Sequence, residues 1–123
     1  MAKSVKDILI KDLRVQVNGS LWLEVGGERF FGPGPVELLE RIAETGSISS
    51  AAKEMKMSYK KAWELINHLN TQTSTPVVIP QTGGEKGGGS TITAEAMELI
   101  KYHRGLRKRF AAFLEKETKS LKP

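Results

Sequence analysis

Hydrophobic and polar residues alternate in the first part of the chain, and this pattern predicts β structure. Leu13, Val15 and Val17 alternate with polar neighbours, and a second alternation runs over residues 21–25. A period of two is typical of a half-buried strand, because successive side chains of a strand point to opposite faces. We therefore expect two strands here, each with one apolar face.

The residues between and after these runs predict how the strands connect. Asn18-Gly19 is a strong turn signal, and a three-residue loop over 18–20 places the apolar residues of both strands on one face. Gly26-Gly27 predicts a second turn, which leads into a short strand around 28–31. The aromatic residues Trp22, Phe30 and Phe31 either line a small-ligand site or pack on the first long helix or on a dimer partner.

The period changes to that of a helix after residues 32–35, whose sequence Gly-Pro-Gly-Pro ends the β part and favours a helix start. Apolar residues then recur every three or four positions, which predicts helices over 35–44, 48–55 and 58–71. Ser47 is the expected N-cap of the second helix. The apolar stripes of the three helices comprise Val36, Leu39, Ile42, Ala43; Ile48, Ala51, Ala52, Met55; and Ala62, Leu65, Ile66, Leu69.

A β-hairpin and a long helix are expected after the three helices. Residues 76–80 and 91–93 are short strand candidates on either side of a glycine-rich loop, and Thr93 is the expected cap of a helix over 94–118. This helix carries a seam with alternating spacings of three and four, typical of a coiled coil, so we expect it to form a homodimer. A monomer that covers the seam itself is the alternative. The seam residues are Ala96, Leu99, His103, Leu106, Phe110 and Phe113.

This order of elements predicts an α+β fold: a winged helix-turn-helix with an N-terminal β-hairpin region and a long C-terminal dimerisation helix. We expect one domain over 1–123, with the β region at 1–33, the helix-turn-helix and wing at 35–93, and the dimerisation helix at 94–118.

The third helix is the expected DNA-reading element, because the N-terminal residues of such a helix meet base edges in the major groove. A helical wheel points Lys60, Glu64 and Asn67 outward and places Trp63 at the edge of the core, where it packs or, alternatively, stacks on DNA. A merely solvated helix face is the competing interpretation. The predicted DNA-binding residues are Ser47, Ser49, Ser58, Tyr59, Lys60, Lys61, Glu64, Asn67, Lys86, Gly87 and Gly88.

Composition and charge narrow the function classes. The net charge is +5, and all of the excess lies after Gly46, which favours an anionic partner such as DNA. Cysteine is absent, no apolar run is long enough to cross a bilayer, and the N-terminus does not resemble a signal peptide, so we expect a cytoplasmic protein. The glycine-rich segment lacks the Gly-Lys-Ser/Thr of a phosphate loop. With no paired ligands or catalytic motif, we expect no enzyme activity, no metal and no cofactor.

Four segments carry a family resemblance: residues 44–53 (ETGSISSAAK), 57–63 (MSYKKAW), 82–84 (TGG) and 86–89 (KGGG). Together they resemble the DNA-binding domain of ModE-type molybdate-responsive regulators and, more loosely, the helix-turn-helix of LysR-type regulators. The resemblance implies a dimeric, DNA-binding transcriptional regulator.

Family members that sense molybdate carry C-terminal oxyanion-binding domains, for which a chain of this length leaves no room. We therefore expect this chain to lack the molybdate-binding domain, and molybdate or tungstate is a doubtful ligand. A dimeric protein-interaction module and a small-oxyanion sensor remain the alternative functions.

Overall fold

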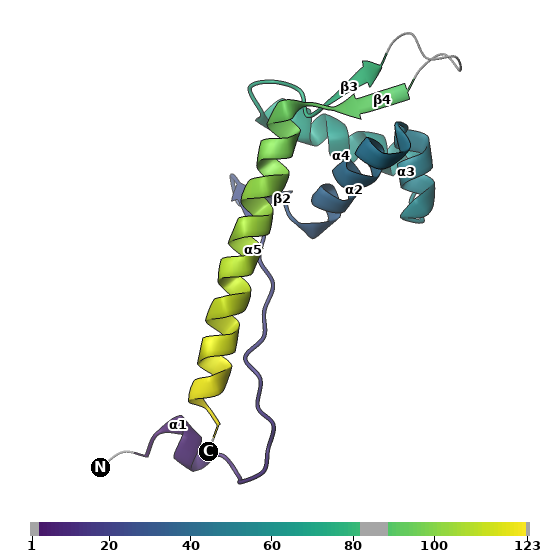
Figure 1. Ribbon diagram of the computed structural model, residues 1–123. Helices are drawn as coiled ribbons and strands as arrows, with labels where there is room; N and C mark the ends of the chain where they lie inside the picture. Colours follow the sequence, from purple (N-terminus) through teal and green to yellow (C-terminus); the bar gives the residue numbers. More distant parts are fainter. Residues whose placement is uncertain (1–2, 82–88, 123) are drawn as a thin grey trace. The chain divides into compact units, whose positions relative to one another are not determined.

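The computed structural model describes residues 3–81 and 89–122 (Figure 1). Their elements are α1 (Val5–Ile8), β1 (Leu23–Val25), β2 (Glu28–Phe31), α2 (Pro33–Thr45), α3 (Ile48–Glu54), α4 (Tyr59–Gln72), β3 (Val78–Gln81), β4 (Gly89–Ile92) and α5 (Ala94–Ser120). The chain forms two compact units, which are described in turn. The winged-helix unit spans Trp22–His103, and the terminal unit joins residues 1–21 to residues 104–123.

Helices α2, α3 and α4 of the winged-helix unit begin and end where the local chemistry of the chain favours it. Helix α2 begins at Pro33, two residues earlier than predicted, because proline is accommodated in the first turn, where its missing N–H is not needed. It ends at Gly46, which takes the left-handed conformation with φ 73°. Ser47 and Ser58 are the N-caps of α3 and α4. The three predicted helices are thus confirmed.

The core of this unit is built around α2, which packs against β2, α3, α4 and β4. Leu38, Leu39 and Ile42 of α2 are fully buried. The predicted stripe was wrong at Ala43, which is exposed, while Leu38 is buried in its place. Leu38 is buried because the neighbours of α2 cover a wider arc of the helix than the predicted stripe. The core also contains the side chains of Phe31, Ile66, Leu69, Val77 and Ile100.

Strands β3 and β4 pair antiparallel and form the base of the predicted hairpin, called the wing below. The wing is held to its surroundings by backbone hydrogen bonds. The Ser90 amide donates to the Gly46 carbonyl at 2.8 Å, and the Thr93 amide donates to the Val77 carbonyl at 3.0 Å. The Thr93 hydroxyl also donates to the Pro76 carbonyl at 2.8 Å. The wing therefore rests on the end of α2 and on the start of α5.

The N-terminal hairpin is not where the sequence predicted it. No strand pairing occurs over residues 13–17, so the predicted hairpin with a turn at Asn18-Gly19 is wrong. Instead, β1 pairs antiparallel with β2 across the two-residue turn Gly26-Gly27. Both glycines have positive φ, 60° and 82°, which the tightest hairpin turns require and which glycine adopts without strain.

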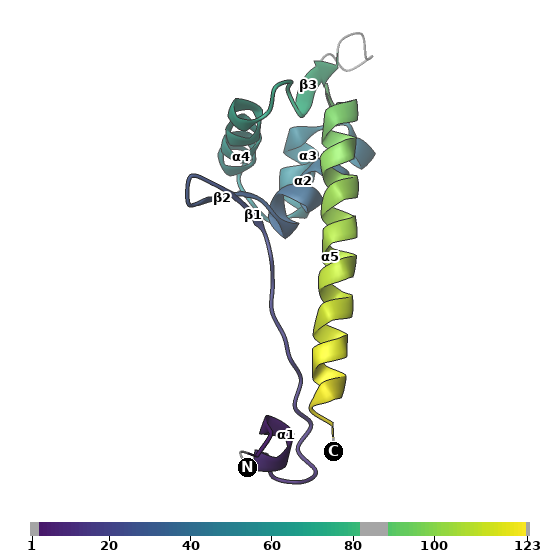
Figure 2. The same cartoon turned by 90° about the vertical axis from the view of Figure 1, so that its left-hand side faces the viewer.

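The terminal unit explains the misleading alternation. Residues 9–21 run as an extended segment beside the end of α5 (Figure 2). Val15 and Val17 are half-buried there, and the Val17 amide donates to the Thr118 hydroxyl at 2.9 Å. Gly19 lies so close to Phe110 that an added Cβ would be 3.2 Å from the ring. The period of two therefore reports an extended chain packed on a helix.

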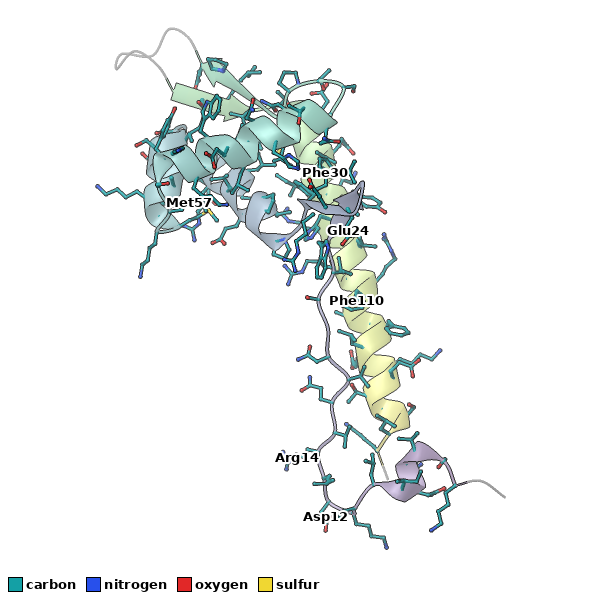
Figure 3. All side chains as sticks on the ribbon, turned by 180° about the vertical axis from the view of Figure 1, so that it is seen from behind. Asp12, Arg14, Glu24, Phe30, Met57 and Phe110 are labelled. Carbon is teal, nitrogen blue, oxygen red and sulfur yellow. The ribbon has the colours of Figure 1, made fainter. Side chains whose placement is uncertain are left out.

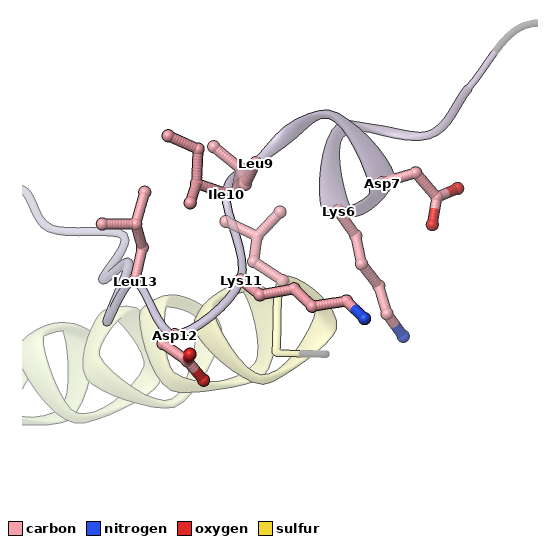
Figure 4. A pocket seen from close by; sticks show the side chains of 8 residues that line it. Lys6, Asp7, Leu9, Ile10, Lys11, Asp12 and Leu13 are labelled. Atoms are coloured by element: carbon pink, nitrogen blue, oxygen red, sulfur yellow. The ribbon is translucent and has the colours of Figure 1, made fainter.

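The start of the terminal unit exposes much apolar surface. Val5, Ile8 and Ile10 are 60%, 66% and 77% exposed, and the segment bends at Asp12, which has φ 75° (Figure 3). A cavity of about 310 Å³ is lined by Lys6, Asp7, residues 9–13 and Leu121 (Figure 4). Every described residue of this unit is exposed or half-buried.

None of the helices that the structure describes combines the length and the apolar character needed to cross a membrane.

Candidate nucleic-acid interface

Helices α3 and α4 form a helix-turn-helix. Ala51 and Ala52 of α3 and Ala62 of α4 are buried where the helices pack, and their small side chains allow a close approach. The turn between the helices contains Lys56, which has φ 56°, and the Met57 amide donates to the Ala52 carbonyl at 3.0 Å. This short turn places the first residues of α4 directly after α3.

Both helices of the motif start at a serine whose side chain caps the helix. The Ser47 hydroxyl accepts a hydrogen bond from the Ser50 amide, and the Ser58 hydroxyl accepts one from the Lys61 amide, each at 3.1 Å. A hydroxyl that accepts in this way still has its own O–H to donate. The two predicted DNA contacts at Ser47 and Ser58 are therefore compatible with capping. Ser49, in the first turn of α3, is exposed.

The solvent face of α4 carries the predicted recognition residues. All six predicted residues at the start and on the outer side of this helix are exposed: Ser58, Tyr59, Lys60, Lys61, Glu64 and Asn67. Trp63 is 49% exposed, so the expectation that it anchors the edge of the core is wrong. It lies one helical turn after Tyr59, which is 55% exposed, so the two aromatic rings share this face. The spacing of four residues between Tyr59 and Trp63 was the sequence signal that could have placed Trp63 on this face.

The charge of this surface is predominantly positive. Lys53 at the end of α3 and Lys56 in the turn, which were not among the predicted DNA-binding residues, are exposed, as are Lys60 and Lys61. Within the described part of the chain, none of these four lysines has an ion-pair partner. Glu64 is the acidic residue on the same face of α4. A surface of this kind attracts a polyanion.

An arginine on α2 fixes the position of α3. The Arg41 guanidinium donates to Glu37 on its own helix and to Glu54 on α3, with two N···O distances of 2.8 Å. These hydrogen bonds raise the pKa of Arg41 above its ordinary value. The Glu54 carboxylate is thereby held next to Arg41, which leaves Lys53 and Lys56 as the unpaired charges at this end of α3.

The wing is connected to α4 at its base. The Val77 amide, just before β3, donates to Oδ1 of Asn70 on α4 at 2.7 Å. The predicted wing contacts Lys86, Gly87 and Gly88 lie outside the described residues.

The predicted seam of α5 is not one exposed stripe. Ala96 and His103 are 0% and 1% exposed, because both pack inside the winged-helix unit. The His103 ring meets the Phe31 ring edge to face, with centroids 5.7 Å apart. These two residues therefore belong to the core of their own chain. Leu99, Leu106 and Phe110 are half-buried, and Phe113 is 53% exposed.

Among residues 3–81 and 89–122, no group of three or more acidic or histidine side chains lies close enough to hold a metal ion.

Comparison with known proteins supports the helix-turn-helix assignment. Residues 35–97 match the model of the family described as "Bacterial regulatory helix-turn-helix protein, lysR family". The molybdenum-pterin-binding protein MopB of Rhodobacter capsulatus is 39% identical over 99 residues, which cover 80% of this chain and 36% of MopB. The DNA-binding transcriptional dual regulator ModE of Escherichia coli is 39% identical over 83 residues, which cover 68% of this chain and 32% of ModE.

The molybdenum transport protein ModE of Azotobacter vinelandii is 34% identical over 86 residues, 70% of this chain and 32% of that protein. The chain thus spans about a third of the length of these relatives. The predicted resemblance to ModE-type DNA-binding domains is confirmed.

Proposed function

Because the chain belongs to the lysR family of bacterial regulatory helix-turn-helix proteins, we propose that it is a transcriptional regulator that binds double-stranded DNA sequence-specifically as a homodimer. The observation that carries this proposal is the exposed, lysine-rich start of α4. Six polar or aromatic side chains from Tyr59 to Asn67 face solvent there, and Ser58 caps the start of the helix.

The N-terminal half of α4 enters the major groove, which is about 12 Å wide and admits one helix. Lys60, Glu64 and Asn67 share one side of α4 and read base edges, since a lysine can donate to guanine, an asparagine can pair with adenine and a glutamate can accept from cytosine. Tyr59 and Trp63 form the adjoining aromatic strip, which makes apolar contacts with bases or sugars.

Backbone contacts position the helix in the groove. Lys53, Lys56 and Lys61 are the unpaired cations that approach the phosphates, and they set how strongly binding depends on salt. Ser47 and Ser49 at the start of α3 donate their hydroxyl groups to a neighbouring phosphate. Lys86, Gly87 and Gly88 act at the wing, where a lysine and glycine amides suit a phosphate or the minor groove.

The homodimer forms through the later part of α5. A unit of about 40 residues is too small to be stable without a further partner, and every described residue of the terminal unit is at least partly exposed. Phe110 and Phe113 stack with ring centroids 6.4 Å apart, and together with Leu106 they offer an apolar surface that a second copy covers. A dimer reads two half-sites about one helical turn apart.

Enrichment of genomic DNA fragments on the purified protein tests this function. We expect a palindromic motif whose half-sites are separated by about 10 base pairs. As a control, a scrambled version of the enriched site is added as competitor and should not displace the enriched site from the protein. Binding that stays weak and indifferent to sequence at physiological salt would refute specific DNA recognition and would favour the protein-interaction module.

The names of two relatives mention molybdenum, but the chain matches only about a third of each. We propose that the matched third supplies the DNA binding and that this binding needs no molybdate or tungstate. Calorimetry tests this proposal: we expect no heat with either anion and an unchanged DNA affinity in their presence. A saturable heat signal together with a changed DNA affinity would show that the chain senses the oxyanion.

A further inference from the structure

The winged-helix unit contains a cavity of about 250 Å³ that the DNA-binding proposal does not use. It lies between the β1–β2 hairpin, the start of α2 and one side of α4, and its walls include the aromatic residues Trp22, Phe30 and Phe31. We propose that this cavity binds a small aromatic carboxylate: one ring bearing one acidic group.

The size and lining of the cavity fit a single ring. An apolar cavity of about 150 Å³ accommodates benzene, so 250 Å³ leaves room for a ring and a substituent. Phe31 and Leu69, each 1% exposed, fix the inner wall, and the half-buried Leu65 adds apolar surface. Gly32 allows the close packing of this wall, because a Cβ there would lie 3.1 Å from the Trp22 Cβ.

The charged side chain in the cavity lining, Arg29, favours an acid. The Arg29 guanidinium lies over the Trp22 ring at 3.8 Å, and Trp22 is oriented by its Nε1–H donating to Glu24 at 2.8 Å. Stacking uses the flat face of the guanidinium, so its N–H edge remains for a carboxylate. Arg29 has no ion pair with the described residues, although Glu24 is its cross-strand neighbour. The Glu24 carboxylate accepts from Trp22 and lies outside the cavity lining, which contains Arg29 and His68 but no acidic side chain.

The occupant also contacts the helix that carries the proposed DNA face. Leu65, His68 and Leu69 of α4 line the cavity, while Lys60 and Asn67 of the same helix face solvent. The binding site is nevertheless separate from the DNA surface, and its test does not depend on DNA.

Titration of the ¹⁵N-labelled full chain with benzoate, followed by NMR, tests the proposal. The chain has two tryptophans, so two indole N–H signals are expected, and the Trp63→Phe variant assigns them. We expect benzoate to shift the Trp22 signal saturably and to leave the Trp63 signal in place. Benzamide, the neutral analogue, and benzylamine, the cationic one, should bind at least about tenfold more weakly.

Two variants locate the binding. Arg29→Gln should weaken benzoate binding about tenfold, to the level of benzamide, whereas Arg107→Gln on α5 removes another exposed arginine and should change nothing. Leu65→Trp fills the cavity and should abolish the Trp22 shift; an unchanged chemical-shift dispersion elsewhere shows that this variant is folded. The proposal is overturned if benzoate leaves the Trp22 signal unmoved, or if the Arg29→Gln and Arg107→Gln variants bind benzoate equally well.

Discussion

Replacing Gly89 by alanine probes how the wing is attached to the helices. A Cβ at position 89 would lie 2.6 Å from the carbonyl oxygen of Gly46, whereas an ordinary C···O contact is no shorter than about 3.3 Å. The overlap is therefore roughly 0.7 Å. The oxygen belongs to the backbone at the end of α2, so it cannot rotate away as a flexible side chain would.

The same oxygen accepts the hydrogen bond from the Ser90 amide at 2.8 Å. Relieving the overlap at Gly89 moves β4 away and weakens this bond. Overpacking costs about 1–3 kcal/mol and a lost hydrogen bond about 1 kcal/mol, so we expect a loss of about 2–4 kcal/mol in the free energy of unfolding. For a domain of this size, the melting temperature then falls by roughly 10 °C.

Urea unfolding followed by far-ultraviolet circular dichroism measures the effect of the Gly89 substitution. Gly105→Ala on α5 is the control, because the atom nearest to a Cβ at position 105 is the end of the flexible Arg109 side chain, at 3.2 Å. We expect Gly105→Ala to leave the stability unchanged or slightly raised, because alanine in a helix interior is favoured over glycine. Equal stabilities for the two variants would refute the close contact between β4 and the end of α2.

Three further predictions concern the caps, the corner after α2 and the dimer. Ser58→Ala removes the cap of α4 and should cost about 1 kcal/mol in urea unfolding, while the exposed Ser49→Ala should cost almost nothing; equal costs would contradict the capping role. Gly46→Ala forces a side chain into the left-handed region and should cost about 1–2 kcal/mol, and an unchanged midpoint in urea would argue against this conformation. Phe113→Ser should weaken the dimer at least tenfold in analytical ultracentrifugation, whereas Tyr102→Ser, a similarly exposed control on the same helix, should not; a monomeric unaltered chain would contradict the proposed dimer.

The helices of the fold were predictable from the sequence because their signals are local. Ser47 caps α3 as predicted, Ser58 lies at the predicted start of α4 and caps it, and the alanines of both helices pack as the apolar spacing indicated. The turn at Gly26-Gly27 was also correct, since two adjacent glycines supply the positive φ of a tight hairpin turn.

The errors concern which element covers an apolar residue. The alternation at Val15 and Val17 identified an extended segment, but a helix rather than a strand covers it. The spacing of Ala96 and His103 identified an apolar stripe, but it does not reveal that the core of the same chain covers this part of α5. Trp63 was expected to pack at the edge of the core because the helical wheel places it between the buried and the exposed arcs, although it lies with Tyr59 on the exposed face. The spacing of apolar residues indicates which face of a helix or extended segment is buried. It does not indicate which other element of the fold covers that face.

The salt dependence of DNA affinity, measured by fluorescence anisotropy on the enriched site, tests most directly whether α4 contacts DNA. We compare the unaltered chain with Lys61→Ala, which removes a proposed phosphate contact from α4, and with Lys101→Ala, a control that removes an exposed lysine from α5. We expect Lys61→Ala to weaken binding about tenfold and to flatten the slope of log affinity against log salt concentration by about one, and Lys101→Ala to change neither. If the two variants have the same affinity and the same slope, α4 does not carry the DNA contact.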